Sequence, residues 1–267
     1  MRKISTILLA FTLMSFLFVS CSSVPITGRK QLNIIPESEM LSMSFNQYTQ
    51  FLQEHKESTN AQQNALVKRV GSNIAAAVEQ YLRQNGKSDE VKNYQWEYHL
   101  VEDSQVNAWC MPGGKIVVYT GILPVTKDEN GLAVVLGHEI AHAVAHHGNE
   151  RMSQALIAQL GGIALSEALK SKPQETQQLW LSVYGVGAEV GVLLPYSRTQ
   201  ESEADHLGLI FMAMAGYDPH GALDFWERMQ AQSQGSPPVF LSDHPANQTR
   251  INDIKTELPE AMKYYKK

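Results

Sequence analysis

The chain has little cysteine, little net charge and no block of basic residues. Two cysteines occur in 267 residues, so stability must come mainly from core packing and not from a disulfide framework. The 22 Lys and Arg against 27 Asp and Glu give a formal net charge of −5. Without a basic cluster to meet phosphates, a nucleic-acid partner is not expected.

Long apolar runs are also missing after residue 20. The two most apolar later segments, residues 155–169 and 179–194, are shorter than the roughly 20 uncharged residues that span a bilayer, and the second contains Glu189. We expect both to be buried helices whose glycines permit close backbone approach, with contact at a membrane surface as the alternative. Internal repeats and low-complexity tracts are absent from the sequence too.

The first twenty residues differ from the rest. A basic start, "MRK", precedes an apolar stretch that ends in "LFVSC", which predicts a signal peptide over residues 1–20. The end resembles a bacterial lipobox with Phe18 in place of the usual Leu, so we expect Cys21 to carry lipid; an uncleaved anchor is the alternative. Lipidated Cys21 would leave Cys110 as the free thiol. No Asp follows Cys21, which favours the periplasmic face of the outer membrane.

The remaining sequence predicts a tether followed by one α+β domain. Residues 21–36 carry Pro, Gly and polar residues without periodicity, as expected of a tether to residues 37–267. Two β-rich stretches flank a Pro-Gly-Gly turn signal, which suggests a hairpin-like sheet edge. The predicted strands cover 94–103 and 115–123; predicted helices cover 37–55, 64–86, 129–147, 150–170, 175–193, 197–215, 219–232 and 246–257.

The strongest chemical signal is His138-Glu139-x-x-His142 inside the predicted helix 129–147. The i, i+4 spacing places both imidazoles on one helical face, where they can bind one metal ion. Glu139 is rotated about 100° from His138 and lies beside the metal, as a general base must. Buried histidines and glutamates are costly unless something pairs them, so the apolar surroundings favour a metal site.

A catalytic zinc site takes three protein ligands and leaves a fourth position open. A third histidine ten residues after His138 is excluded, because that position is Gly148. His146 and His147 continue the same predicted helix about 12 Å along its axis, too far to share the metal. We expect these two histidines to lie at the surface or at the helix end, near its C-terminal dipole.

The remaining source of a third ligand is the segment "SRTQESEADHLGL". Glu201 and Asp205 stand i, i+4 on a second predicted helix, so one carboxylate could bind the metal while the other accepts the free N–H of a ligating histidine. Most acidic clusters are solvated helix faces. Spacing alone does not choose among Glu201, Glu203 and Asp205.

These motifs together resemble the HtpX-like zinc metallopeptidases of peptidase family M48. The resemblance rests on "PITGRKQL", "VNAWCMPGGKIVVYTGIL", "VVLGHEIAHAVAHHGNER", "SRTQESEADHLGL" and "HPANQTRI". It implies a zincin-like, gluzincin-type fold that is mostly helical, with a small sheet whose edge strand binds substrate. It also implies one Zn²⁺ on His138, His142 and Glu201, with Glu139 as general base and Asp205 as a supporting carboxylate.

Lacking internal membrane spans, the chain is more similar to the soluble or lipid-anchored periplasmic members of this family. It departs from their usual Asn-Ala-Phe edge motif, because Asn107 and Ala108 are followed by Trp109. A Trp still offers a broad apolar wall, so we expect a shifted side-chain preference. His244, before Pro245, resembles a histidine that approaches the zinc, either as a latency ligand or as a donor to the developing oxyanion.

The resemblance therefore predicts a zinc endopeptidase that hydrolyses unfolded or misassembled cell-envelope proteins, bound in extended form along residues 105–111. Expected partners are unfolded polypeptide, the membrane through the N-terminal lipid, and outer-membrane assembly machinery. The second hypothesis is a non-proteolytic envelope chaperone in which zinc is structural and His244 fills the fourth ligand position. A thiol enzyme built on Cys110 is a third and weaker one, because no resolving cysteine exists.

Overall fold

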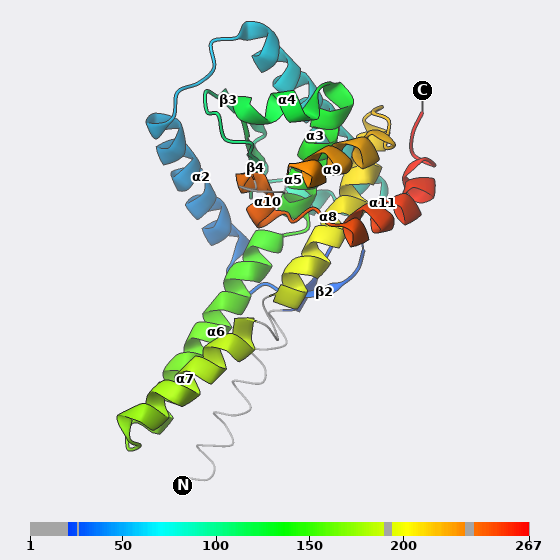
Figure 1. The fold of residues 1–267 in the computed structure, drawn as a ribbon. Coiled ribbons are helices and arrows are strands. Elements are labelled where there is room, and N and C mark those ends of the chain that lie inside the picture. The colour runs from blue at the N-terminus through cyan, green and yellow to red at the C-terminus, as the bar shows by residue number, and fades with distance from the viewer. Residues whose placement is uncertain (1–20, 26, 190–193, 233–237, 267) are drawn as a thin grey trace.

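The structure is a computed structural model that describes residues 21–25, 27–189, 194–232 and 238–266. Helices dominate it (Figure 1). They are α2 (Glu37–Glu54), α3 (Ala61–Gln84), α4 (Leu123–Thr126), α5 (Glu129–Val144), α6 (His147–Leu169), α7 (Gln174–Ala188), α8 (Leu194–Met214), α9 (Gly221–Ala231), α10 (Val239–Asp243) and α11 (Gln248–Ala261), with 3₁₀ turns η1 (Ser88–Val91) and η2 (Thr120–Ile122).

The described residues also form five short strands: β1 (Cys21–Ser23), β2 (Lys30–Leu32), β3 (Glu97–Val101), β4 (Ala108–Met111) and β5 (Lys115–Tyr119). This α+β content confirms the predicted fold class. Every predicted helix is present, and those of its ends that lie in described residues are within a few residues of the predicted bounds. The predicted signal peptide, residues 1–20, and residues 190–193 of a predicted apolar helix lie outside the described residues.

The sheet beside the core has the order β3-β5-β4. β4 pairs antiparallel with β5 through the predicted Pro-Gly-Gly turn, and β3 pairs parallel with β5. Gly113 and Gly114 have φ of +88° and +81°, a left-handed conformation that other residues adopt only with strain. The turn thus leaves β4 at one edge of this sheet, as the resemblance implied, whereas the two strands predicted from composition, β3 and β5, pair parallel and do not form the hairpin.

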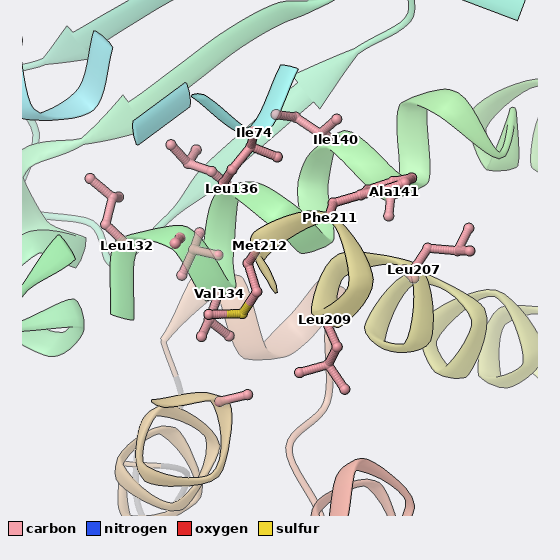
Figure 2. Close-up of a cluster of buried hydrophobic side chains, with 14 of the residues drawn as sticks. Ile74, Leu132, Val134, Leu136, Ile140, Ala141, Leu207, Leu209, Phe211 and Met212 are labelled. Carbon is pink, nitrogen blue, oxygen red and sulfur yellow. The ribbon is translucent and has the colours of Figure 1, made fainter. Parts of the chain in front are cut away.

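Helix α5 runs through the centre of the molecule. All its residues from Gly131 to Val144 are buried, which its nearly continuous apolar sequence requires. It packs against α3, α8, α9 and β4. Figure 2 shows Leu136 and Ile140 of α5 near Ile74 of α3, with Phe211 of α8 nearby.

Helices α5 and α8 touch backbone to backbone at two glycines. A Cβ on Gly208 would lie 2.9 Å from the backbone nitrogen of His138 and 3.0 Å from the carbonyl carbon of Gly137. Real Cβ atoms essentially never approach backbone so closely. Only glycine therefore permits this separation, which brings the Glu201 end of α8 within reach of His138 and His142.

Helix α5 ends earlier than predicted. His146 adopts the left-handed conformation with φ of +58° and caps the start of α6. A single residue therefore turns the chain, and residues 145–147 do not continue α5. The predicted helix 129–147 is divided at this point, which changes where His147 lies.

The expectation that residues 155–169 and 179–194 form buried helices is wrong for their described part. Helices α6 and α7 pack against each other in a hairpin that projects from the domain (Figure 1). Several apolar side chains on it are exposed, among them Leu160 at 56%, Ile163 at 59% and Leu179 at 62%. Tyr184 fills the space beside Gly161, so the glycines serve this local pairing. No described helix is long and apolar enough to traverse a bilayer.

The segment expected to be a tether contains an ordered hairpin. β1 and β2 pair antiparallel, and Val24 between them is fully buried. The chain beyond β2 is fixed to α6, where the Ile34 N–H donates to Ser153 Oγ at 2.9 Å and Asn149 donates to the Ile35 carbonyl at 2.8 Å. The hairpin is therefore part of the folded unit, although its composition suggested a linker.

The glycine contact between α5 and α8 gives the first prediction. Gly208→Ala should lower the free energy of unfolding by about 1–3 kcal/mol, because the new methyl group forces the two helices apart. Gly185→Ala in α7, where an added Cβ meets nothing within 4 Å, should leave it unchanged or raise it by up to about 1 kcal/mol. Urea denaturation of both variants measures this, and equal stability of Gly208→Ala and wild type would contradict the packing argument.

Candidate metal centre

Four predicted side chains converge at the centre of the domain. His138 and His142 come from α5, Glu201 comes from α8, and His244 follows α10. All four are buried, and one potential ligand atom from each lies within 4.8 Å of the others. The glycine contact between α5 and α8 makes this convergence possible.

The separations between donor atoms suit a zinc ion. His138 Nε2 lies 3.1 Å from both His142 Nε2 and His244 Nδ1. The two oxygens of Glu201 lie 3.2 Å from His142 Nε2 and 3.3 Å from His138 Nε2. Donors around a tetrahedral zinc with bonds of about 2.0–2.1 Å are separated by about 3.3 Å.

A buried carboxylate oxygen also fits a metal. Glu201 Oε1 has no hydrogen-bond partner among the described residues, although it is shielded from solvent. Such an orphaned acceptor is costly unless a cation meets it. Burial opposes ionisation of Glu201, but the surrounding imidazoles outweigh it and lower the pKa of this carboxyl below its usual value. The residues present therefore fit one zinc ion.

His138 is oriented from behind by Asp205. Asp205 Oδ1 lies 3.0 Å from His138 Nδ1, and Arg250 binds the same carboxylate through two nitrogens at 2.6 and 2.7 Å. The guanidinium stacks 3.5 Å above the ring of Trp226. Burial works against a charged His138, but Asp205 and Glu201 raise its pKa to about 9 in the metal-free protein. The Asp205 carboxylate accepts the Nδ1 proton, and Nε2 faces the other donor atoms.

The expected surface location of His147 is wrong. Its side chain is fully buried, with Nδ1 2.8 Å from His142 Nδ1 and Nε2 3.0 Å from Glu203 Oε2. The prediction assumed one unbroken helix, whereas the left-handed His146 redirects the chain. His146 itself is half-buried at the helix end, 3.2 Å from Glu90. Spacing within an assumed helix could not reveal this contact.

Glu139 lies beside the four donors and not among them. Its carboxylate is buried, with Oε1 3.3 Å from His244 Nε2. Burial raises the pKa of Glu139, although His244 and His138 oppose the shift. A carboxylate with a raised pKa next to a metal position can take up a proton from water at near-neutral pH.

The edge strand β4 contacts α5 on one face. Ala108 packs in the main core with Cys110 beside it, while Trp109 points to the other face against Phe51. The indole N–H of Trp109 donates to the Tyr119 hydroxyl at 3.3 Å. The ring of Trp109 is therefore held by α2 and β5. The apolar surface that we expected this ring to offer to substrate lies on the face of β4 away from α5.

Two further predicted residues have defined places. Asn107 precedes β4, and its side-chain oxygen accepts the Ala108 N–H at 2.9 Å. Cys110 is half-buried, and burial raises the pKa of its thiol well above the ordinary value. A thiol that resists ionisation is a poor nucleophile, which disfavours the thiol-enzyme hypothesis.

Comparison with known proteins bears on this geometry. The family model described as Peptidase family M48 matches residues 61–258, which include α5, α8 and His244. This chain belongs to peptidase family M48. M48 metallopeptidases are zinc enzymes, so residues 61–258 form a metallopeptidase domain whose donor cluster suits zinc.

Curated relatives carry names of the same kind. The chain is 33% identical over 252 residues to the mitochondrial metalloendopeptidase OMA1 of Schizosaccharomyces pombe, covering 92% of this chain and 69% of the relative. It is 32% identical to OMA1 of Bos taurus, over 93% of this chain and 48% of the relative. The beta-barrel assembly-enhancing protease of Yersinia pestis is 30% identical, over 60% of this chain and 34% of the relative. The chain thus spans about half or less of two of these relatives.

Glu257 of α11 gives a pH-dependent prediction. Burial raises its pKa to about 8, and Asp205, Asp253 and Glu260 add to the shift. Its folded pKa therefore exceeds the unfolded value, so the protein loses stability as pH rises from about 4.5 through 8. Glu257→Gln should raise the free energy of unfolding at pH 9, on the order of 1 kcal/mol after solvent screening, and change it little at pH 5.

Denaturation of wild type and Glu257→Gln at the two pH values measures this difference. Glu260→Gln, which removes a carboxylate from the same helix end, is the matched control, and its free energy of unfolding at pH 9 should rise by less. Equal gains for Glu257→Gln at pH 5 and pH 9 would contradict the assignment.

Proposed function

We propose that this chain is a zinc-dependent endopeptidase that cleaves unfolded or misassembled proteins of the bacterial cell envelope. The observation that carries the proposal is the buried cluster of His138, His142, Glu201 and His244 with Glu139 beside it. A structural zinc site needs no neighbouring base, whereas a hydrolytic one does. Family membership and the relatives named as metalloendopeptidases support the same reaction.

In the proposed reaction, His138, His142 and Glu201 hold one Zn²⁺, which when bound supplies Lewis acidity toward water and the scissile carbonyl. Asp205 and Arg250 keep the His138 ring oriented. Glu139 takes the proton from the attacking water and passes it to the leaving amine. The raised pKa of Glu139 suits both transfers, because the carboxylate must accept a proton and then release it.

The substrate in this proposal lies extended along residues 105–111. β4 is an edge strand of its sheet and contacts α5, so a polypeptide that paired with it would pass the metal centre. Backbone pairing selects for extended conformation more than for sequence. That selection favours unfolded chains, and Asn107, Ala108 and Trp109 would supply the pairing segment.

The compartment is the further part of the proposal. A lipid on Cys21, after removal of residues 1–20, would hold the domain at the periplasmic face of the outer membrane. The similarity to a protein named beta-barrel assembly-enhancing protease supports an outer-membrane assembly partner. The relatives named as mitochondrial metalloendopeptidases support the endopeptidase reaction.

Glu139→Gln tests the mechanism. The variant should keep one zinc per chain, because Glu139 is not a ligand, and should lose cleavage of unfolded casein by about 10²–10⁴-fold, because the base is gone. Glu129→Gln, at the exposed start of the same helix, is the control and should cleave like wild type. Metal analysis and a peptide-release assay make the measurement. Casein cleavage by Glu139→Gln at the wild-type rate would refute the proposed base.

A second candidate function follows from His244. Its ring is buried with Nδ1 2.9 Å from Glu201 Oε2 and 3.1 Å from His138 Nε2, the place of a fourth ligand. A site closed by four protein ligands is typical of structural zinc. The chain would then act as a non-proteolytic, zinc-stabilised envelope chaperone or assembly factor.

His244→Ala distinguishes the two functions. If His244 covers the metal of a latent peptidase, the variant should cleave casein faster than wild type. If His244 donates to the developing oxyanion, cleavage should fall by about 10²–10³-fold with zinc retained. The rates of casein cleavage by zinc-loaded wild type and zinc-loaded His244→Ala distinguish these roles. Zinc-loaded wild type and His244→Ala that both fail to cleave would favour the chaperone.

A further inference from the structure

A buried series of polar contacts leads from the metal centre to the N-terminal hairpin. His142 Nδ1 lies 2.8 Å from His147 Nδ1, and His147 Nε2 lies 3.0 Å from Glu203 Oε2. The Glu203 carboxylate in turn accepts Arg29 Nε–H at 2.8 Å and the hydroxyl of Thr27. Arg29 and Thr27 lie between β1 and β2, outside the residues that the family model matches.

The two ends of this series determine where its protons lie. Nε2 of His142 faces the donor cluster, and when that nitrogen binds the metal the proton of the neutral ring must be on Nδ1. Nδ1 of His147 must then accept that proton in a hydrogen bond, which leaves its own proton on Nε2. Nε2–H donates to the carboxylate of Glu203. Every donor in the series meets an acceptor, and His147 is neutral.

Arg29 holds the outer end in place. Its guanidinium binds Glu203 and also binds Glu150 through two nitrogens at 2.8 and 2.7 Å. Glu150 is fully buried, and Gln200 donates to it at 2.7 Å. Two carboxylates this close and this buried would repel each other without a cation. A planar guanidinium meets both at once, which an ammonium does less well.

We propose that His147 is the positioning residue for His142, and that Arg29 of the β1–β2 hairpin fixes His147 through Glu203. The inference rests on the proposed role of His142 as a metal ligand. A ligating histidine needs a partner for its second nitrogen, to fix its tautomer and ring angle. For His138 that partner is the Asp205 carboxylate directly. For His142 an imidazole stands between the ring and the carboxylate.

The consequence is that part of the metal site is built by residues next to the predicted lipid attachment. The hairpin begins at Cys21, and its residues Thr27 and Arg29 reach Glu203 on α8. Loss of the hairpin would leave Glu203 and Glu150 buried without their cation. The ring of His142 would then lose the support that holds it toward the metal.

Cobalt binding tests this positioning role without reference to cleavage. The full purified chain is stripped of metal and titrated with Co²⁺, whose visible absorption reports the ligand geometry. His147→Leu should weaken Co²⁺ binding by about 10–100-fold and change the absorption bands. His147→Gln should restore most of the affinity, since its oxygen can accept from His142 and its amide can donate to Glu203. His146→Asn is the neighbouring control and should bind like wild type.

The hairpin end is tested in the same titration. Arg29→Ala should weaken Co²⁺ binding in the same direction by a smaller factor, whereas Lys30→Ala, which removes an exposed cation from the same hairpin, should not. Wild-type affinity and bands in His147→Leu would overturn the proposal. If His147→Leu does not fold, the Co²⁺ affinity of Arg29→Ala decides instead. A Co²⁺ affinity of Arg29→Ala equal to that of Lys30→Ala overturns the proposal. Wild type that binds no Co²⁺ refutes the proposed metal centre itself.

Discussion

The carboxylate of Glu201 is buried among three imidazoles, and the rest of the structure depends on keeping it there. A carboxylate away from water needs a cation or several donors to offset its lost hydration. Two helices must approach closely to place it against His138 and His142. The contact between Gly137 and Gly208 provides that approach, so residues without side chains determine the position of the donor cluster.

Support for the cluster of four potential ligands comes from residues outside it. Arg250 from α11 contacts Asp205, which in turn contacts His138. Arg29 from the N-terminal hairpin contacts Glu203, which is connected to His142 through His147. The contacts that lead outward from His138 and from His142 therefore each end at a carboxylate paired with an arginine. The core around these ion pairs is apolar, and its packing fixes their geometry.

Much of this could be predicted from sequence because it depends on short-range pattern. The i, i+4 spacing of His138 and His142 places them on one face of any helix, and the Pro-Gly-Gly signal predicts the turn that precedes β5. Apolar periodicity gave the helices. The choice of Glu201 over its acidic neighbours required the family resemblance, because spacing on α8 was equally consistent with Glu203 or Asp205.

The errors arose where long-range packing or one backbone dihedral decided the outcome. Composition made residues 21–36 look like a linker, since nothing local shows that Arg29 meets buried carboxylates more than a hundred positions away. Apolar content made α6 and α7 look like core helices, although they pair with each other outside it. His147 was misplaced because φ at His146 is positive.

Helix α6 starts at His147 and extends 23 residues, so it is about 35 Å long. One end touches an imidazole of the metal centre, and the other projects beyond the domain. The contacts of Asn149, Glu150 and Ser153 with the N-terminal segment fix the first two turns of α6. The far tip of the α6–α7 hairpin is therefore presented well away from the donor atoms, with apolar side chains that the domain core does not cover.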